Sequence, residues 1–109
     1  MNCNKIALQL IVTIVRKGKA ETVMDAARQA GAEGGTILNG RGTGIHEKAS
    51  ILGMAIEPEK EIVLILTPKA KVQRILESIG NSIEIEKPGR GLAFVIDVEK
   101  VIGICHNLD

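Results

Sequence analysis

The stretch over residues 31–44, which reads GAEGGTILNGRGTG, constrains the fold of this chain more than any other. It contains six of the twelve glycines, and such clusters occur where the backbone takes unusual dihedral angles or passes close to another group. We expect Gly31 to end a helix, Gly34 and Gly35 to begin a strand, and the later glycines to release that strand into a long loop. A second glycine turn, PGRG over residues 88–91, follows far along the chain. The base of the loop and this turn are our candidates for the two halves of a ligand site.

The size, charge and cysteine content limit the class of protein. The chain has 109 residues, and we expect one domain over residues 1–109. An apolar fraction of 45% with 25% charged residues is typical of a globular protein, and the net charge of +1 argues against nucleic acid as a partner. No apolar run approaches the ~20 residues of a membrane span, so we expect no membrane insertion. Two cysteines do not make a disulfide framework, and we expect reduced thiols and a cytoplasmic location.

Hydrophobic periodicity predicts the order strand, helix, strand, strand, helix, strand. The strands are expected over residues 6–15, 35–39, 61–66 and 92–98, and the helices over residues 20–30 and 67–80. We expect the Thr67 hydroxyl to cap the second helix, with Pro68 at its first position and Gly80 at its end. Less regular extended pieces are expected over residues 82–86 and 101–105.

The segment between the second and third strands, residues 40–58, has no clean hydrophobic period. A long irregular segment in a compact domain is usually functional or disordered. A short helical turn and a strand extension around residues 51–56 are both compatible with the apolar residues there.

This order of elements predicts an α+β fold of the ferredoxin-like βαββαβ type, an antiparallel sheet with two helices on one face. Phe94 is the only aromatic residue, so the core must be built from Ile, Val, Leu and Ala. The face of the sheet away from the helices is also apolar in the sequence, and a single domain cannot cover it. We therefore expect an oligomer that packs sheet against sheet.

The same features resemble the PII signal-transduction family, that is, the nitrogen regulatory proteins P-II. The resemblance rests on the order of elements, on GAEGGTILNGRGTG after the first helix, and on PGRGLAFVIDVEKVIGI near the end. It covers most of the chain and implies a divergent member with a shortened T-loop. The resemblance implies a homotrimer that binds ATP or ADP in clefts between subunits, and a T-loop that docks on a transporter, enzyme or regulator, usually in nitrogen metabolism.

Individual residues are carried over from the family to this chain. Thr36, Gly42 and Gly44 match the T-loop base, and Gly89, Arg90 and Gly91 match the B-loop, which here covers residues 87–92. Backbone N–H groups exposed by glycines suit phosphate oxygens, and Arg90 adds a planar donor, although a solvated turn arginine is an equally good interpretation of Arg90. The effector loop covers residues 41–58. Its candidate partner-binding residues are Thr43, His46, Glu47, Lys48 and Ser50.

The chain also departs from the family pattern. Leu92 stands where the family closes the B-loop with a basic residue, and Gly103 and Cys105 stand where it has two phosphate-binding arginines. The family's T-loop glutamine falls on His46, and its lysine for 2-oxoglutarate with magnesium falls on Glu59 or, with a one-residue shift, on Lys60. A chain without tyrosine excludes uridylylation, and these departures argue against 2-oxoglutarate sensing. Arg41 and Arg90 are the candidates to replace the lost positive charge.

Two alternatives to a nucleotide sensor remain. One is a metal-binding trimer that resembles the divalent-cation-tolerance (CutA-type) proteins, with Cys3, His46, Cys105 and His106 as ligands, although buried thiols and a solvated loop histidine are the commoner interpretation. The other is an oligomer of the same fold that has lost nucleotide binding. No residue lies in a recognisable nucleophile elbow, and neither histidine has an evident orienting acid, so we expect a non-enzymatic protein.

Overall fold

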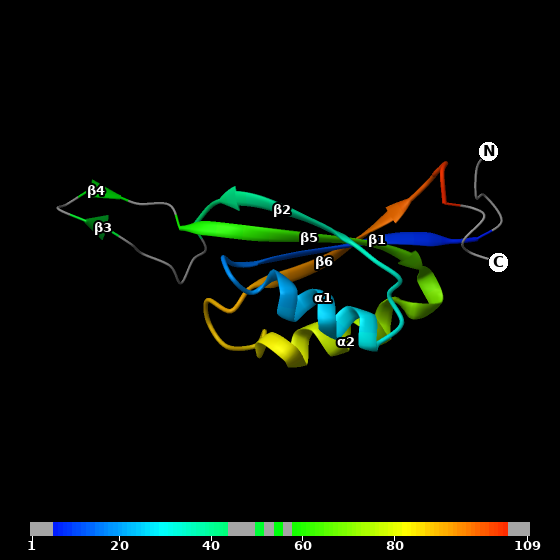
Figure 1. Cartoon of the computed structure of the whole chain (residues 1–109), viewed down its shortest axis with the longest axis horizontal. Coiled ribbons are helices and arrows are strands. Elements are labelled where there is room, and N and C mark those ends of the chain that lie inside the picture. Colours follow the sequence, from blue (N-terminus) through cyan, green and yellow to red (C-terminus); the bar gives the residue numbers. More distant parts are fainter. Residues whose placement is uncertain (1–5, 44–49, 52–53, 56–57, 105–109) are drawn as a thin grey trace.

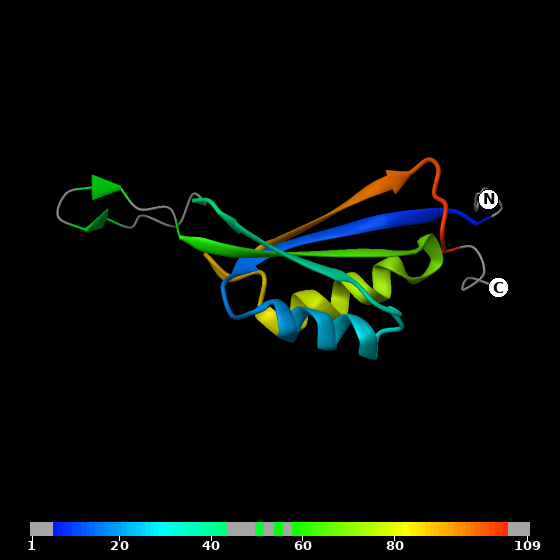
Figure 2. The same cartoon turned by 45° about the horizontal axis from the view of Figure 1, so that its top comes forward.

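The computed structural model, which describes residues 6–43, 50–51, 54–55 and 58–104, contains a four-stranded antiparallel sheet with two helices on one face (Figures 1 and 2). The strand order is β2-β5-β1-β6. The sheet is built from β1 (Leu8–Arg16), β2 (Thr36–Arg41), β5 (Glu59–Pro68) and β6 (Leu92–Val98), and the helices are α1 (Ala20–Gln29) and α2 (Lys69–Ile83). This is the ferredoxin-like βαββαβ arrangement, so the predicted fold class is confirmed.

Alternation along the strands divides their side chains between the two faces of the sheet. In the middle of β1, Ile11 pairs with Ile65 of β5 and Val95 of β6, and these residues face the helices. The next residue, Val12, pairs with Leu64 and Phe94, and that set lies on the face without helices. Apolar residues at consecutive positions therefore make both faces of the sheet apolar.

The two helices bury one stripe each against the sheet. The buried residues recur at helical spacing, as the sequence predicts: Ala20, Val23, Met24, Ala26 and Ala27 in α1, and Val72, Ile75, Ile79 and Ile83 in α2. Three side chains of α2 also donate hydrogen bonds to carbonyl oxygens at the end of α1. They are Lys71 to Gly31 (3.1 Å), Arg74 to Ala30 (2.8 Å) and Ser78 to Ala26 (2.7 Å). The last carbonyls of a helix have no partner within it, and positive charge at that end is favourable, so these contacts fix α2 beside α1.

The end of α1 agrees with the sequence prediction. Gly31 has a φ of +109°, and its N–H bonds to the Arg28 carbonyl while the Ala32 N–H bonds to the Ala27 carbonyl. These two hydrogen bonds form a Schellman motif, which requires a residue in the left-handed conformation at the position of Gly31.

The predicted limits of α2 are wrong at both ends. Thr67 is buried and still paired in β5, and no side chain caps the helix; instead, the Lys69 N–H donates to the Ala7 carbonyl oxygen at 2.9 Å. The helix also continues through Gly80 to Ile83, and Glu84 takes the left-handed conformation (φ 52°) that ends it. A Cβ at Gly80 would lie 3.3 Å from Ile85, so this glycine allows the chain to fold back onto the helix rather than ending it.

Two predicted extended pieces are not strands in the structure. Residues 82–83 belong to α2, and residues 84–86 form a turn. The described part of the second piece, residues 101–104, is not in a strand either, and Gly103 has a φ of +98° there.

The long segment between β2 and β5 contains two short strands, β3 (Ser50–Ile51) and β4 (Met54–Ala55), which pair with each other antiparallel. Of the two alternatives for residues 51–56, the described residues favour strand over helix. In Figure 1 this strand pair lies well beyond the end of the four-stranded sheet.

Candidate functional site

The candidate site lies at the end of the sheet from which the effector loop leaves. β1 and β2 end there, at Arg16 and Arg41, while β5 and β6 begin there, at Glu59 and Leu92. This common edge follows from the antiparallel pairing of neighbouring strands, which places the end of each beside the start of the next.

The root of the effector loop is closed by backbone contacts. Arg41 pairs with Glu59 across β2 and β5, and one residue further out the Gly42 N–H donates to the Pro58 carbonyl oxygen at 3.1 Å. Among the residues that the structure describes, a Cβ at Gly42 would meet nothing within 4 Å. A ligand can approach the chain closely at Gly42, although its N–H is already in use.

A cavity of about 410 Å³ lies at this root. It is lined by Lys17, Asn39, Gly40, Arg41, Glu59 and Lys60. Lys17 Nζ lies 2.9 Å from a Glu59 carboxylate oxygen; the hydrogen bond and the opposite charges raise the pKa of Lys17 and lower that of Glu59. Lys60 is buried, whereas its neighbour Glu59 is exposed. Both residues line the cavity, but only the lysine is packed into the protein there.

The glycine turn over residues 88–91 packs onto the last residues of β1. Gly89 and Gly91 have φ values of +75° and +142°. A Cβ at Gly91 would lie 2.8 Å from the Ile14 carbonyl oxygen, and a Cβ at Gly89 would lie 2.7 Å from the Arg16 guanidinium. Both positive φ values favour glycine. At Gly91 the Ile14 backbone also leaves no room for a Cβ, whereas the Arg16 side chain beside Gly89 can move.

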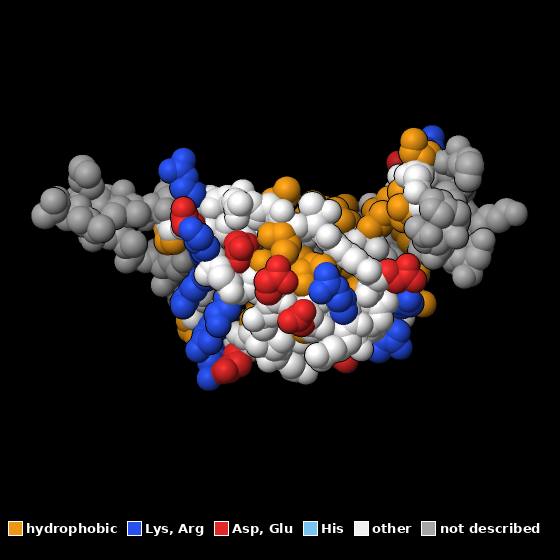
Figure 3. Space-filling view, in the orientation of Figure 1, with side chains coloured by type: hydrophobic (Ala, Val, Ile, Leu, Met, Phe, Trp, Pro, Cys, Tyr) orange, Lys and Arg blue, Asp and Glu red, His pale blue; other side chains and the backbone are white. Residues whose placement is uncertain are grey.

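Arg16 is not among the residues that the sequence predicts for the site. Within the sequence it stands as the first of several cations in a polar turn, and its contact with Gly89 joins positions 73 residues apart. Five basic residues, Arg16, Lys17, Arg41, Lys60 and Arg90, thus belong to the ends of elements at this edge. Figure 3 shows Lys and Arg side chains gathered at the end of the body where the loop begins.

The predicted nucleotide-binding residues are only partly brought together. Arg41 and Gly42 lie at the loop root, but Thr36 lies at the other end of β2, roughly 16 Å away at strand spacing. Gly89, Arg90 and Gly91 lie at the same edge of the sheet as Arg41, but on the far side of β5 and β1. Three interstrand spacings, roughly 14 Å, separate the two groups within one chain.

Other predicted residues fall partly beyond what the structure describes. Thr43 is exposed beside the loop root, and Ser50 lies in β3. Gly44, His46, Glu47 and Lys48 lie outside the described residues, as do three of the proposed metal ligands, Cys3, Cys105 and His106. Within the described ranges, no group of three or more His, Cys, Asp or Glu residues is placed to hold a metal ion.

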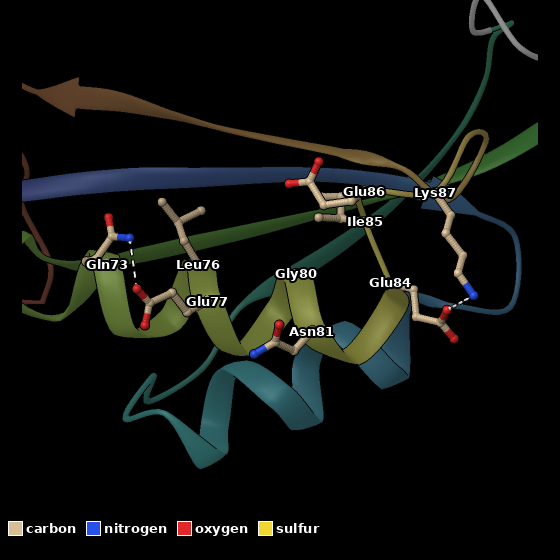
Figure 4. Close-up of a pocket in the computed structure, with 9 residues that line it drawn as sticks. All are labelled: Gln73, Leu76, Glu77, Gly80, Asn81, Glu84, Ile85, Glu86 and Lys87. Atoms are coloured by element: carbon tan, nitrogen blue, oxygen red, sulfur yellow. Dashed lines mark hydrogen bonds and ion pairs between the residues drawn. The ribbon is translucent and has the colours of Figure 1, made fainter.

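A second cavity, of about 670 Å³, lies along α2 and the turn that follows it (Figure 4). Its walls carry three carboxylates, Glu77, Glu84 and Glu86, against the single cation Lys87. Lys87 forms an ion pair with Glu84, and Gln73 donates a hydrogen bond to Glu77 at 3.1 Å. The excess of negative charge makes this cavity unsuited to a phosphate group.

Comparison with known proteins agrees with these features. The family model for Nitrogen regulatory protein P-II matches residues 8–107. Among solved structures, the B. subtilis GlnK–ATP complex has a TM-score of 0.70 and 19% sequence identity, covering 90% of this chain and 87% of that one. A structure of B. subtilis GlnK has a TM-score of 0.71 and 20% identity, covering 90% of both chains. At these identities the structural likeness shows the fold alone, whereas the family match spans nearly all of the sequence.

Members of this family are non-enzymatic regulators, in agreement with the absence of a recognisable catalytic motif in the sequence. In the part of the chain that the structure describes, no helix is long and apolar enough to cross a membrane. The family match over residues 8–107, with which the βαββαβ fold agrees, shows that the chain belongs to the nitrogen regulatory protein P-II family.

Proposed function

We propose that this chain is a cytoplasmic, homotrimeric regulator that binds an anionic effector, with an adenine nucleotide as the first candidate, between neighbouring subunits. The observation that carries this proposal is the pair of half-sites at one edge of the sheet. The loop root contributes Arg41, Lys17 and Lys60, and the glycine turn contributes Arg90 and contacts Arg16 through Gly89. Because roughly 14 Å separates Arg41 from the glycine turn within one chain, we expect a second subunit to bring a loop root against a glycine turn.

The exposed face of the sheet supports the trimer. Leu92, Phe94 and Ile96 of β6 are 51%, 42% and 47% exposed, and Leu38 of β2 is 45% exposed. A contiguous apolar sheet face of this kind marks an interface in a soluble protein. Packing three such faces together would bury these side chains and place the edges of neighbouring subunits side by side.

The chemistry of the half-sites supports an anionic effector. Guanidinium groups such as Arg41 and Arg90 present planar sets of donors that match phosphate oxygens. The glycines allow phosphate to approach the backbone, and the solved GlnK structure that this fold resembles is a complex with ATP. In the proposed mechanism, the bound effector favours one conformation of the loop over residues 41–58, and a partner protein recognises that conformation.

Calorimetric titration of the purified oligomer with ATP and with ADP tests the proposal, with and without magnesium and 2-oxoglutarate. We expect saturable binding near one nucleotide per subunit and a loss of affinity of roughly 10-fold or more in Arg90→Gln, because hydrogen bonds to charged groups contribute ~1.5–3 kcal/mol. Arg28→Gln, which removes an exposed arginine of α1 far from the site, is the matched control and should bind like the wild type. Monomeric protein by light scattering, or equal affinity in both variants, would contradict the proposal.

A specific observation favours a second candidate, a P-II oligomer without nucleotide binding. Leu92, which stands at the start of β6 where the family has a basic residue, is an exposed apolar residue, and Gly103 supplies no charge. A trimer that gives no heat with either nucleotide, at concentrations where the family's ligands bind, would favour this alternative.

A further inference from the structure

The turn between β1 and α1, residues 16–20, contacts both halves of the proposed site. Its first residue, Arg16, lies against the glycine turn, since its guanidinium is 2.7 Å from the place where a Cβ at Gly89 would lie. Its second residue, Lys17, contacts the root of the effector loop through Glu59. The turn therefore lies, within one subunit, between the two elements that the proposed function assigns to the effector sites.

Glu61 of β5 fastens this turn from the sheet. Its Oε1 accepts hydrogen bonds from the Gly18 N–H at 2.6 Å and from the Ala20 N–H at 3.1 Å. The helix has no cap of its own, because Lys19 at the N-cap position makes no side-chain cap bond. A carboxylate that accepts bonds from backbone N–H groups at a helix N-terminus makes a strong, charge-assisted contact. Glu61 thus supplies, from another element, the cap that α1 lacks.

A second fastening lies two residues earlier on the same strand. The Lys17 N–H donates to the Glu59 carbonyl oxygen at 3.3 Å, and Lys17 Nζ pairs with the Glu59 carboxylate at 2.9 Å. Glu59 and Glu61 are the partners of Arg41 and Asn39 across β5 and β2. Any shift of these two acids therefore moves the strand pair from which the effector loop starts.

We propose that Glu61, with Glu59 as its second point of attachment, is a positioning residue that couples the loop root to the glycine turn through residues 16–20. This inference deepens the proposed function, because it gives the physical link between effector contacts at residues 89–91 and the conformation of the loop at residues 41–58. In this proposal Glu61 acts through the turn, to which its carboxylate is hydrogen-bonded. It holds the turn at the place where Arg16 reaches Gly89 and Lys17 reaches Glu59.

The link is tested first without any ligand, in the full chain, by NMR of Glu61→Gln. We expect the Gly18 and Ala20 amides to exchange at least ~10-fold faster, because a charge-assisted bond is lost. The decisive readouts are farther away: the chemical shifts of Gly89 and Gly91, and the exchange of the Gly42 amide, which is bonded to Pro58. A merely structural cap would change residues 18–20 and leave residues 42, 89 and 91 as in the wild type, which would overturn the inference.

Two further variants complete the experiment. Glu33→Gln removes the same charge from an exposed residue after α1 and should leave all of these signals unchanged. If Glu61→Gln does not fold, Glu59→Gln removes the second fastening and must itself shift the Gly89 and Gly91 signals; unchanged signals would again overturn the inference.

Nucleotide binding separates this inference from the proposed function. Where the wild type binds ATP, Glu61→Gln should weaken the binding roughly 3- to 10-fold at unchanged stoichiometry, as expected for a group worth about one hydrogen bond. Equal ATP affinity in the variant would overturn the inference. If the wild type does not bind ATP, the proposed function fails, and the signals of residues 42, 89 and 91 still decide whether the coupling exists.

Discussion

The two faces of the sheet are built from alternate residues of the same strands, yet only one of them is covered by helices. On β5, Val63 and Ile65 face the helices and are fully buried, whereas their neighbours Ile62 and Leu64 face the other way and are only half-buried. The chain thus covers one apolar face by itself and leaves the second without cover. Both faces are largely apolar, so it is the helices, which lie on one side only, that make the difference.

The two faces also differ in the residues that they contain. The covered face contains a polar residue, Thr13, that is fully buried and whose hydroxyl has no hydrogen-bond partner in the part of the chain that the structure describes. The open face is apolar from Leu38 on one edge strand to Phe94 on the other. The covered face is therefore expected to respond to mutation as a protein core, and the open face as an interface between copies.

The largest effect should come from truncation on the covered face. We expect Ile65→Ala to lower the free energy of unfolding by ~2–5 kcal/mol, because it leaves a cavity in a fully buried site. Urea titrations at two protein concentrations measure this, and the loss should be equal at both. Ile96→Ala on the open face is the counterpart, and its cost should depend on protein concentration, as for a residue buried by association. The same concentration dependence for both variants would remove the distinction between the faces.

A charge on the open face should break the oligomer without unfolding the subunit. In Phe94→Glu we expect association to weaken by at least roughly 30-fold, the effect of removing ~2 kcal/mol at a buried aromatic anchor. Sedimentation analysis would show the smaller species, and circular dichroism would show retained structure. An unchanged assembled mass would mean that this face is not the interface.

Two glycines, one just before β2 and one within it, compare how tightly the two faces of the sheet are packed. A Cβ at Gly35 would lie 2.9 Å from both the Leu64 carbonyl oxygen and the Met24 sulfur, on the covered face. A Cβ at Gly40 would lie 3.3 Å from the end of the Ile62 side chain, which can move. Gly35→Ala should therefore cost ~1–3 kcal/mol and Gly40→Ala clearly less, as measured by thermal unfolding. A larger loss of stability in Gly40→Ala than in Gly35→Ala would mean that the covered face is not the more tightly packed one.

The smallest expected effect is an increase in stability. Thr13→Val keeps the shape of the side chain and removes an unpaired buried hydroxyl, so it should stabilise the subunit by about 1 kcal/mol. Denaturant midpoints compared with the wild type at one protein concentration would detect it. A loss of stability instead would show that the hydroxyl has a buried partner such as a water molecule.

Local patterns predict the elements well, because strand alternation, helical spacing and the glycine after α1 are properties of neighbouring residues. The limits of α2 are wrong for the opposite reason. The donor at its start is bonded to Ala7, and the glycine in its last turn is there to allow contact with Ile85. Ala7 is far from the helix in the sequence, and Ile85 contacts Gly80 only because the chain folds back after the left-handed residue Glu84. A local motif such as Thr-Pro is therefore overridden where a distant residue, Ala7 just before β1, provides the acceptor.

The residues of the candidate site also fall into two groups, those that local motifs mark and those that depend on distant contacts. The glycines and Arg41 can be found from sequence because motifs mark them, whereas Arg16 and Glu61 act on groups 73 and 43 residues away. Glu61 gives no sequence signal, since a glutamate at the first position of an apolar strand looks like an ordinary solvated residue. Contacts of this range exist only after the sheet order β2-β5-β1-β6 has brought the strands together.

The closed root of the effector loop has a consequence for engineering. Because Gly42 and Pro58 are bonded to each other where β2 and β5 end their pairing, the ends of the intervening segment are held at a fixed spacing that does not depend on its length. The entropy cost of closing a longer segment grows only with the logarithm of its length, about 0.6 kcal/mol for each doubling. We therefore expect segments from other proteins, or reporter peptides, to be accepted between positions 42 and 58.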